Sequence, residues 1–181
     1  MPTTAEAPTA APTVSAAPPG TAAHRFDGPA DPGVPSDAEV PASAWRFGRP
    51  GGWKTTAYYK RDSSLYLETQ DEARAGRLYA REQIAALTKG WLDQETYLAG
   101  AFQVKWQDEV DTTVGAEHFP AKLAFGRGKS MDHPSQARQV LRLIVRGGDT
   151  TLLAIAIWKD GDAATAAEIE ASVRALTRAS R

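Results

Sequence analysis

A short glycine-rich run is the stretch that comes nearest to a cofactor motif. Phe125-Gly126-Arg127-Gly128-Lys129-Ser130 ends as a phosphate-binding loop does, with a lysine followed by a hydroxyl residue. That loop needs another glycine five residues before Gly128, where Leu123 stands. No apolar helix is expected after the run either. We therefore interpret the run as a basic hairpin loop rather than as a nucleotide site.

A second group of residues has the types found in hydrolases. Asp132, His133 and Ser135 lie close together, and His118 lies elsewhere in the chain. A catalytic triad is defined by geometry, and the chain has no strained nucleophile turn of the G-x-S-x-G type. Pro134 marks the segment as a loop. A small hydrolase is therefore the weakest of the functions considered, and we interpret these histidines as surface residues.

Asp108, Glu109 and Asp111 form an acidic cluster that could attract a cation. Along a strand Glu109 and Asp111 share a face, whereas Asp108 points away. Two carboxylates supply too few oxygens for calcium, which takes about six or more. The chain has no cysteine, which excludes thiolate chemistry and Cys-based metal sites. We predict no catalytic residues, no metal and no cofactor, and hence a protein that is not an enzyme.

The element that organises the chain is a predicted hairpin over residues 139–158. Two apolar runs flank Gly147-Gly148, and glycines reach the positive φ values of a tight turn. The second run, residues 152–158, is apolar on both alternating faces. Such a strand must be covered on both sides, so we place it centrally in a sheet.

The remaining segments alternate between strand and helix periodicity. Helical spacing of Ala80, Ile84, Leu87 and Trp91 predicts a helix over residues 74–92. A final helix is predicted from the stripe Ile169, Val173 and Leu176, with Thr165 and Glu168 as a capping box. Strands are expected over residues 45–47, 55–59, 65–69, 102–114, 121–125 and 137–145, with a polar loop over residues 126–135. The predicted fold is α+β, an antiparallel β-sheet flanked by helices in an α/β/α sandwich.

The first 44 residues differ in composition from the rest. They hold nine of the twelve prolines, one cation and five carboxylates, whereas residues 45–181 hold 20 cations and 17 carboxylates. We expect residues 1–44 to be a disordered Ala/Pro-rich tail or tether and residues 45–181 to be the folded domain. Neither charge balance is large enough to drive binding to nucleic acid. The longest strongly apolar run has nine residues, against the roughly 20 of a transmembrane helix.

Several motifs of the domain occur in the same order in a known superfamily. They are the turn Pro50-Gly51-Gly52-Trp53, the strand pair over residues 114–125, the hairpin over residues 140–158 and the closing helix Glu168–Leu176. Over residues 45–178 the chain thus resembles the PsbP-like and DcrB-like superfamily, in which many members are small bacterial lipoproteins. The resemblance implies an α/β/α sandwich and non-enzymatic work. The start of the tail also looks like the segment after the lipid-modified cysteine of lipoproteins, which implies a lipid anchor outside the given sequence.

We expect a non-catalytic binding or assembly protein, an accessory subunit or lipoprotein-like module of a complex in the bacterial periplasm or cell envelope. Its partners would be proteins of a membrane-associated or multi-subunit assembly. A cytoplasmic chaperone or adaptor for a secretion-system effector is the alternative. Interfaces are enriched in aromatic residues and arginine, so the candidates for partner contact are Trp45, Arg49, Trp53, Tyr58 and Trp106.

Overall fold

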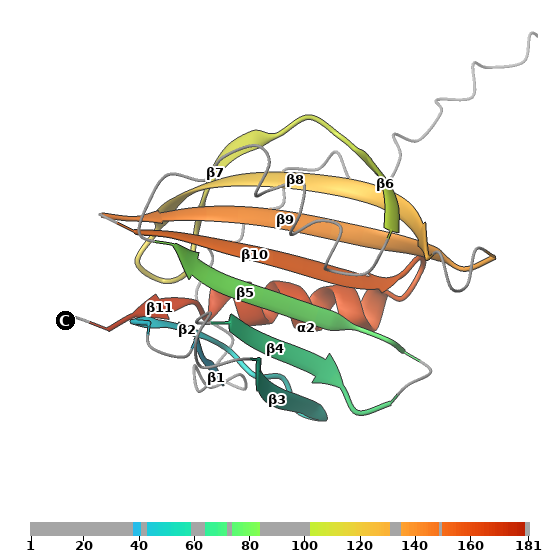
Figure 1. The fold of residues 1–181 in the computed structure, drawn as a ribbon, viewed down its shortest axis with the longest axis horizontal. Helices are drawn as coiled ribbons and strands as arrows, with labels where there is room; N and C mark the ends of the chain where they lie inside the picture. The colour runs from blue at the N-terminus through green and yellow to red at the C-terminus, as the bar shows by residue number, and fades with distance from the viewer. Residues whose placement is uncertain are drawn as a thin grey trace, which may run out of the picture.

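The computed structural model of the protein describes residues 38–40, 43–58, 64–71, 74–83, 102–130, 135–148 and 150–179. Within this part a long antiparallel sheet dominates, with the strand order β3-β4-β5-β10-β9-β8-β6 (Figure 1). The strand β7 pairs with the first half of β8, and β6 pairs with the second half. The bounds are β3 Trp53–Tyr58, β4 Ser64–Thr69, β5 Arg77–Gln83, β6 Phe102–Trp106, β7 Val110–Val114, β8 Phe119–Ser130, β9 Ala137–Gly147 and β10 Thr150–Lys159.

The central position predicted for the apolar run at residues 152–158 is confirmed. Strand β10 lies between β5 and β9, and no residue from Leu152 to Trp158 is more than 4% exposed. Its even-numbered residues belong to the main hydrophobic core, and its odd-numbered residues belong to a second cluster on the opposite face of the sheet. The predicted hairpin also forms, because Gly147 pairs with Thr150 and Gly148 takes a φ of 69°.

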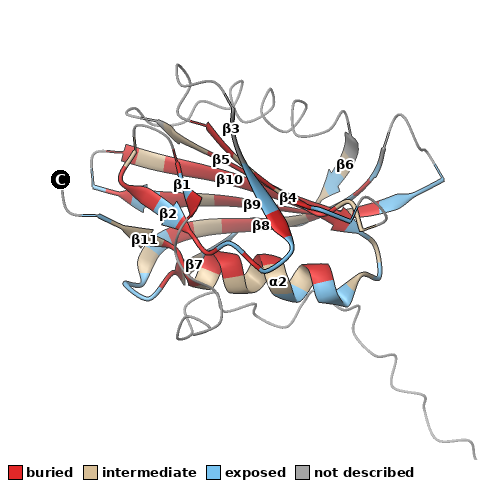
Figure 2. Ribbon diagram, turned by 90° about the horizontal axis from the view of Figure 1, so that it is seen from below, coloured by how far each residue is buried: buried red, intermediate tan, exposed pale blue. Residues whose placement is uncertain are grey.

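One helix is described, and it covers one face of the sheet. This helix, α2, spans Ala163–Arg174, and its buried residues Ile169 and Val173 pack into the main core. A small second sheet lies beside it, made of β1 Ala38–Glu39, β2 Trp45–Phe47 and β11 Thr177–Arg178. Figure 2 shows the buried residues of α2 on the side that faces the strands.

The predicted α/β/α sandwich is wrong for the part of the chain that the structure describes. That part is mostly antiparallel strand, in two sheets, with α2 as its single helix. The prediction failed mainly at residues 74–92, where helical spacing was read from four residues. Residues 77–83 form β5 instead, paired with β4 on one side and β10 on the other. Two ladders of sheet hydrogen bonds outweigh a helical pattern this short. Residues 84–92 lie outside the described part.

Three local predictions also need correction. Gly126–Ser130 was expected in a loop but continues β8, where it pairs with β6. Residues 102–114 form two strands, β6 and β7, instead of one. Residues 107–109 lie between them outside the strands, so that β6 pairs with the second half of β8 and β7 pairs with the first half. The N-cap of the last helix is Asp162, three residues before the expected Thr165. Aspartate ranks at least as high as threonine among N-cap residues, which favours this earlier start.

The described chain begins before residue 45, where the domain was expected to start. Ala38 and Val40 are fully buried, and β1 pairs with β2 through Ala38 and Phe47. Val40 also donates its backbone N–H to the carbonyl of Trp45. The core therefore includes a few residues that composition alone assigned to the tail.

Candidate functional site

The helix α2 is fixed at its first turn by a side chain that precedes it. The Asp162 carboxylate accepts a hydrogen bond from the backbone N–H of Thr165 at 3.0 Å and another from the Thr165 hydroxyl at 2.5 Å. These bonds satisfy an amide that has no partner within the helix. The next turns then lie against the sheet through the stripe Thr165, Ile169, Ser172 and Val173.

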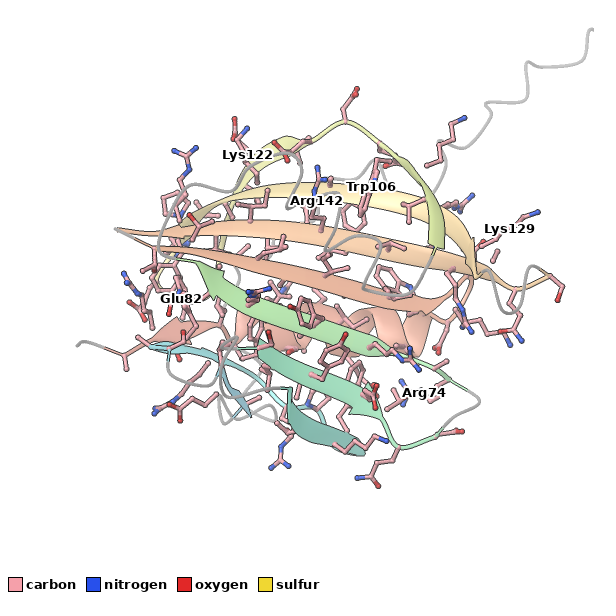
Figure 3. All side chains as sticks on the ribbon, in the orientation of Figure 1. Arg74, Glu82, Trp106, Lys122, Lys129 and Arg142 are labelled. Atoms are coloured by element: carbon pink, nitrogen blue, oxygen red, sulfur yellow. The ribbon has the colours of Figure 1, made fainter. Side chains whose placement is uncertain are left out.

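On the side of β3, β4 and β5, polar groups hold α2 tightly. Arg74, in the connection between β4 and β5, donates to Glu168 Oε2 at 2.6 Å and to Thr165 Oγ1 at 2.8 Å. The indole N–H of Trp53 donates to the same Glu168 oxygen at 2.7 Å. Figure 3 shows Arg74 beside this connection, at the edge of the molecule. A Cβ added at Gly76 would lie 2.5 Å from Thr165 Cγ2, so no empty space remains here.

We call the contacts of Arg74 and Trp53 with Thr165 and Glu168 the clamp. Its charges shift the pKa values of Arg74 and of Asp162. The hydrogen bond to Glu168 raises the pKa of the Arg74 guanidinium, against a smaller opposing effect of burial. Burial alone would raise the pKa of Asp162. The hydrogen bonds from Thr165 and the charge of Arg74 together outweigh it, so the pKa of Asp162 is lowered. Both groups therefore remain charged in the folded protein around neutral pH.

The opposite side of α2 is open. Between the helix and strands β8, β9 and β10 lies a groove with a volume of about 420 Å³. Its floor is formed by Phe125, Leu141 and Trp158, and Phe125 and Leu141 are direct cross-strand partners. Its helical wall carries Ala163, Ala166 and Ala167, together with Ile169 and Glu170. The alanines stand at i, i+3 and i+4, which places them on one side of the helix, and their short side chains leave space above the floor.

The groove is also lined by polar side chains, among them Arg127, Gln139 and Glu170. The Gln139 amide donates to Asp160 Oδ1 at 2.7 Å, and an Arg127 nitrogen lies 3.9 Å from the same oxygen. Glu170 accepts a hydrogen bond from Arg174, one turn further along the helix. Ligand sites typically occupy roughly 300–1,000 Å³ and combine an apolar lining with a few convergent polar groups. The groove has both properties.

A row of three basic residues adjoins the groove on the same face of the sheet. We call Lys105, Arg127 and Lys129 the basic row. Lys105 and Arg127 are direct cross-strand partners on β6 and β8, and Lys129 follows two residues after Arg127 on β8. All three are exposed. Within the described residues no carboxylate pairs with Lys105 or Lys129, and Lys129 extends outward at the end of β8 in Figure 3.

The residues proposed for partner contact lie apart from this groove. Trp45 is fully buried against Phe119, with ring centroids 4.9 Å apart, and Trp53 is 3% exposed within the clamp. Trp106 is half-buried on the other face of the sheet, where the Arg142 guanidinium lies 4.9 Å above its ring (Figure 3). Arg49 is exposed. Tyr58 ends β3, and its side chain lies outside the described part.

Among the described residues, those weighed for catalysis and metal binding form no such site. Gly126–Ser130 is strand, which rules out both a phosphate loop and the hairpin loop that we expected. His118 is exposed in the turn before β8, and residues 132 and 133 lie outside the described part. Glu109 pairs with Lys122 at 3.1 Å and with Arg142 at 3.3 Å. In the described ranges no group of three potential metal ligands occurs.

Comparison with known proteins yields no family. No family model matches the chain, and no curated protein matches it. Among solved structures, the chain is similar to a crystal structure from Bacteroides thetaiotaomicron VPI-5482, with a TM-score of 0.48 and 13% sequence identity. That match covers 76% of this chain and 46% of the other, so the chain spans about half the length of the protein it matches. Within the described residues, no helix is long and apolar enough to cross a membrane.

Sequence reasoning missed the groove because its residues come from separate segments. The predicted hairpin put Leu141 and Trp158 on neighbouring strands, but nothing showed that Phe125 or the final helix would lie beside them. A signal was present in the helix. Alanines at 163, 166 and 167 are too small to cover a sheet that contains Phe125 and Trp158, so a space beside that side of the helix was foreseeable.

Proposed function

We propose that the protein is a non-catalytic binding module that holds an apolar ligand in the groove beside α2. In this role it would serve as an accessory subunit or lipoprotein-like component of an assembly in the bacterial envelope. The observation that carries the proposal is the groove of about 420 Å³, floored by Phe125, Leu141 and Trp158 on a sheet face that is otherwise well packed.

An unfilled apolar space is unfavourable for a protein, which supports a functional role. Side chains that line an open groove lack the dispersion contacts that a filled core would give them. Larger residues at Ala163, Ala166 or Ala167 could restore such contacts, since these positions face the floor. A ligand with an apolar part would restore them as well, and it would remove the exposed surface of Phe125 and of the alanines from water.

The envelope location rests on the sequence of the tail. Residues 1–37, which precede β1, are rich in alanine, proline and threonine, a composition suited to a flexible tether between an anchor and a domain. The second candidate function is a cytoplasmic chaperone or adaptor for a secretion-system effector. The groove favours it too, because an apolar side chain of a client could occupy the same space.

Binding to the groove can be tested with a neutral hydrophobic dye. Nile red should bind the full-length protein with enhanced fluorescence, and Ala167→Trp should abolish that binding by filling the groove. The matched control is Ala164→Trp, since Ala164 is equally exposed on α2 but does not line the groove. Equal dye binding by both variants would refute the groove as the binding site.

The proposed location requires a separate experiment. The native protein should be recovered from its own membranes with its partners, and removal of residues 1–37, which precede β1, should release it into the soluble fraction. Recovery in the cytoplasm with an effector protein would favour the chaperone. A free monomer in both preparations would contradict both assignments.

A further inference from the structure

We infer that the ligand of the groove is a single-chain anionic amphiphile of the fatty-acid type, with its carboxylate on the basic row and its chain between α2 and the floor. This inference rests on the proposed function and adds the chemical class of the ligand. Its basis is that an apolar groove and an excess of positive charge meet at one residue, Arg127, which lines the groove and belongs to the basic row.

The basic row is unfavourable unless an anion occupies it. Lys105 and Arg127 are directly opposite each other on neighbouring strands, where like charges destabilise the pairing. Lys129 lies on the same face of β8, about 7 Å further along the strand. Among the described residues, the carboxylate that pairs with the row is that of Asp160, which is 3.9 Å from Arg127 and already accepts a shorter hydrogen bond from Gln139. Two of the three charges thus have no counterion in the described part of the chain.

The acidic residues around the groove do not offset this charge, because each already has a partner. Asp162 caps α2 through Thr165 and lies near Arg74, and Glu170 bonds to Arg174. The capping by Asp162 also occupies the first turn of α2, so the helix end is not available as the anion site. The positive charge at the rim therefore comes from the basic row.

The spatial order of the groove matches the order of groups in such a ligand. Proceeding along the face of β8, Lys129 is exposed, Arg127 is at the rim and Phe125 is on the floor. Leu141 and Trp158 continue the apolar floor across β9 and β10. A carboxylate can accept two parallel hydrogen bonds from an arginine, which would hold the head group at the rim while the chain extends over the floor.

Three ligands with the same chain and different head groups test the inference on the full-length protein. Isothermal titration should show the tightest binding for dodecanoate, weaker binding for dodecanol and the weakest for dodecyltrimethylammonium. Raising the salt concentration should weaken the binding of dodecanoate and leave that of dodecanol nearly unchanged, because screening acts on the charged head alone.

Removal of the basic row gives a matched set of variants. Arg127→Gln should weaken dodecanoate about fivefold, and Lys105→Gln with Arg127→Gln should weaken it about tenfold or more, with little effect on dodecanol. The control is Lys159→Gln. Lys159 is exposed, has no ion pair in the described residues and lies on the face of the sheet opposite to the groove. It should leave the affinity for dodecanoate unchanged.

The possible failures are distinguishable. If all three ligands bind equally and the glutamine variants change nothing, the groove remains a binding site and the anionic head group is refuted. If no ligand binds and Nile red is insensitive to Ala167→Trp, the proposed function fails and the inference fails with it.

Discussion

The two sides of α2 differ in how they meet the sheet. Toward β3, β4 and β5, the helix is held by Arg74 and Trp53, which both donate to Glu168, and by the close approach of Gly76 to Thr165. Toward β8 and β9, the helix presents alanines to an apolar floor and leaves a groove of about 420 Å³. One helix thus has a closed, polar side and an open, apolar side.

This contrast indicates that the groove is not a general looseness of packing. The same helix and sheet achieve full contact a few residues away, where hydrogen bonds of 2.6–2.8 Å fix their positions. A rigid helix on one side allows an opening of defined shape on the other, which is the arrangement that precise ligand sites require. The clamp should therefore govern stability, and the groove should govern binding.

The largest expected effect is on stability, when one aromatic side chain is removed from the closed side of α2 and one from the open side. Trp53→Ala should reduce the free energy of unfolding by about 3–5 kcal/mol, because a buried indole and its hydrogen bond to Glu168 are both lost. Phe125→Ala should cost about 1–2 kcal/mol, since this half-buried ring already borders open space. Urea unfolding measures both. Equal losses would show that the two sides do not differ as described.

A smaller effect is expected where a single methyl group is added to the clamp. Gly76→Ala should destabilise the protein by about 1–3 kcal/mol, since its Cβ would lie 2.5 Å from Thr165 Cγ2 and 3.0 Å from Thr69 Cγ2. Gly51→Ala is the control, because a Cβ there has no atom within 4 Å and the change should stay within about 0.5 kcal/mol. A neutral Gly76→Ala would mean that the closed side is not tightly packed.

The smallest expected effect concerns the pH dependence of the clamp. The pKa of Asp162 is lowered in the folded protein, so its carboxylate contributes stability above the ordinary aspartate pKa of about 3.9. That contribution, about 1 kcal/mol, should be lost as the pH falls from there through the lower folded-state pKa. Thermal unfolding should show Asp162→Asn as less stable than the natural protein at neutral pH, with the difference vanishing in acid. A constant difference would contradict this assignment.

Parts of the fold were predictable from the sequence because they depend on local patterns. The hairpin over residues 139–158 combines two apolar runs with a glycine turn, and the structure confirms it. The final helix is confirmed with Ile169 and Val173 on its buried side, although it ends at Arg174, before the Leu176 that was expected to belong to it. Residues 77–83 show the limit, because Leu78 and Ala80 suit a strand as well as a helix, and only pairing with β4 and β10 decides between them.

The groove was less predictable than the fold for a related reason. It depends on which strands become neighbours and on what α2 leaves uncovered. The sequence gives no distance between Phe125, Leu141 and Trp158, and it does not show that Lys105 will face Arg127. Trp45 and Trp53 were named as contact candidates because interfaces are enriched in aromatic residues, whereas the structure buries both in the core.

Two indole N–H signals offer the most direct test of the central claim, since Trp158 lines the groove and Trp53 belongs to the clamp. NMR spectra of the full-length protein, with these signals assigned through Trp158→Phe and Trp53→Phe, should be recorded during a titration with dodecanoate. We predict that the Trp158 signal moves to saturation while the Trp53 signal stays in place. Movement of Trp53 with an unchanged Trp158 would contradict the claim that ligands enter on the open side of α2.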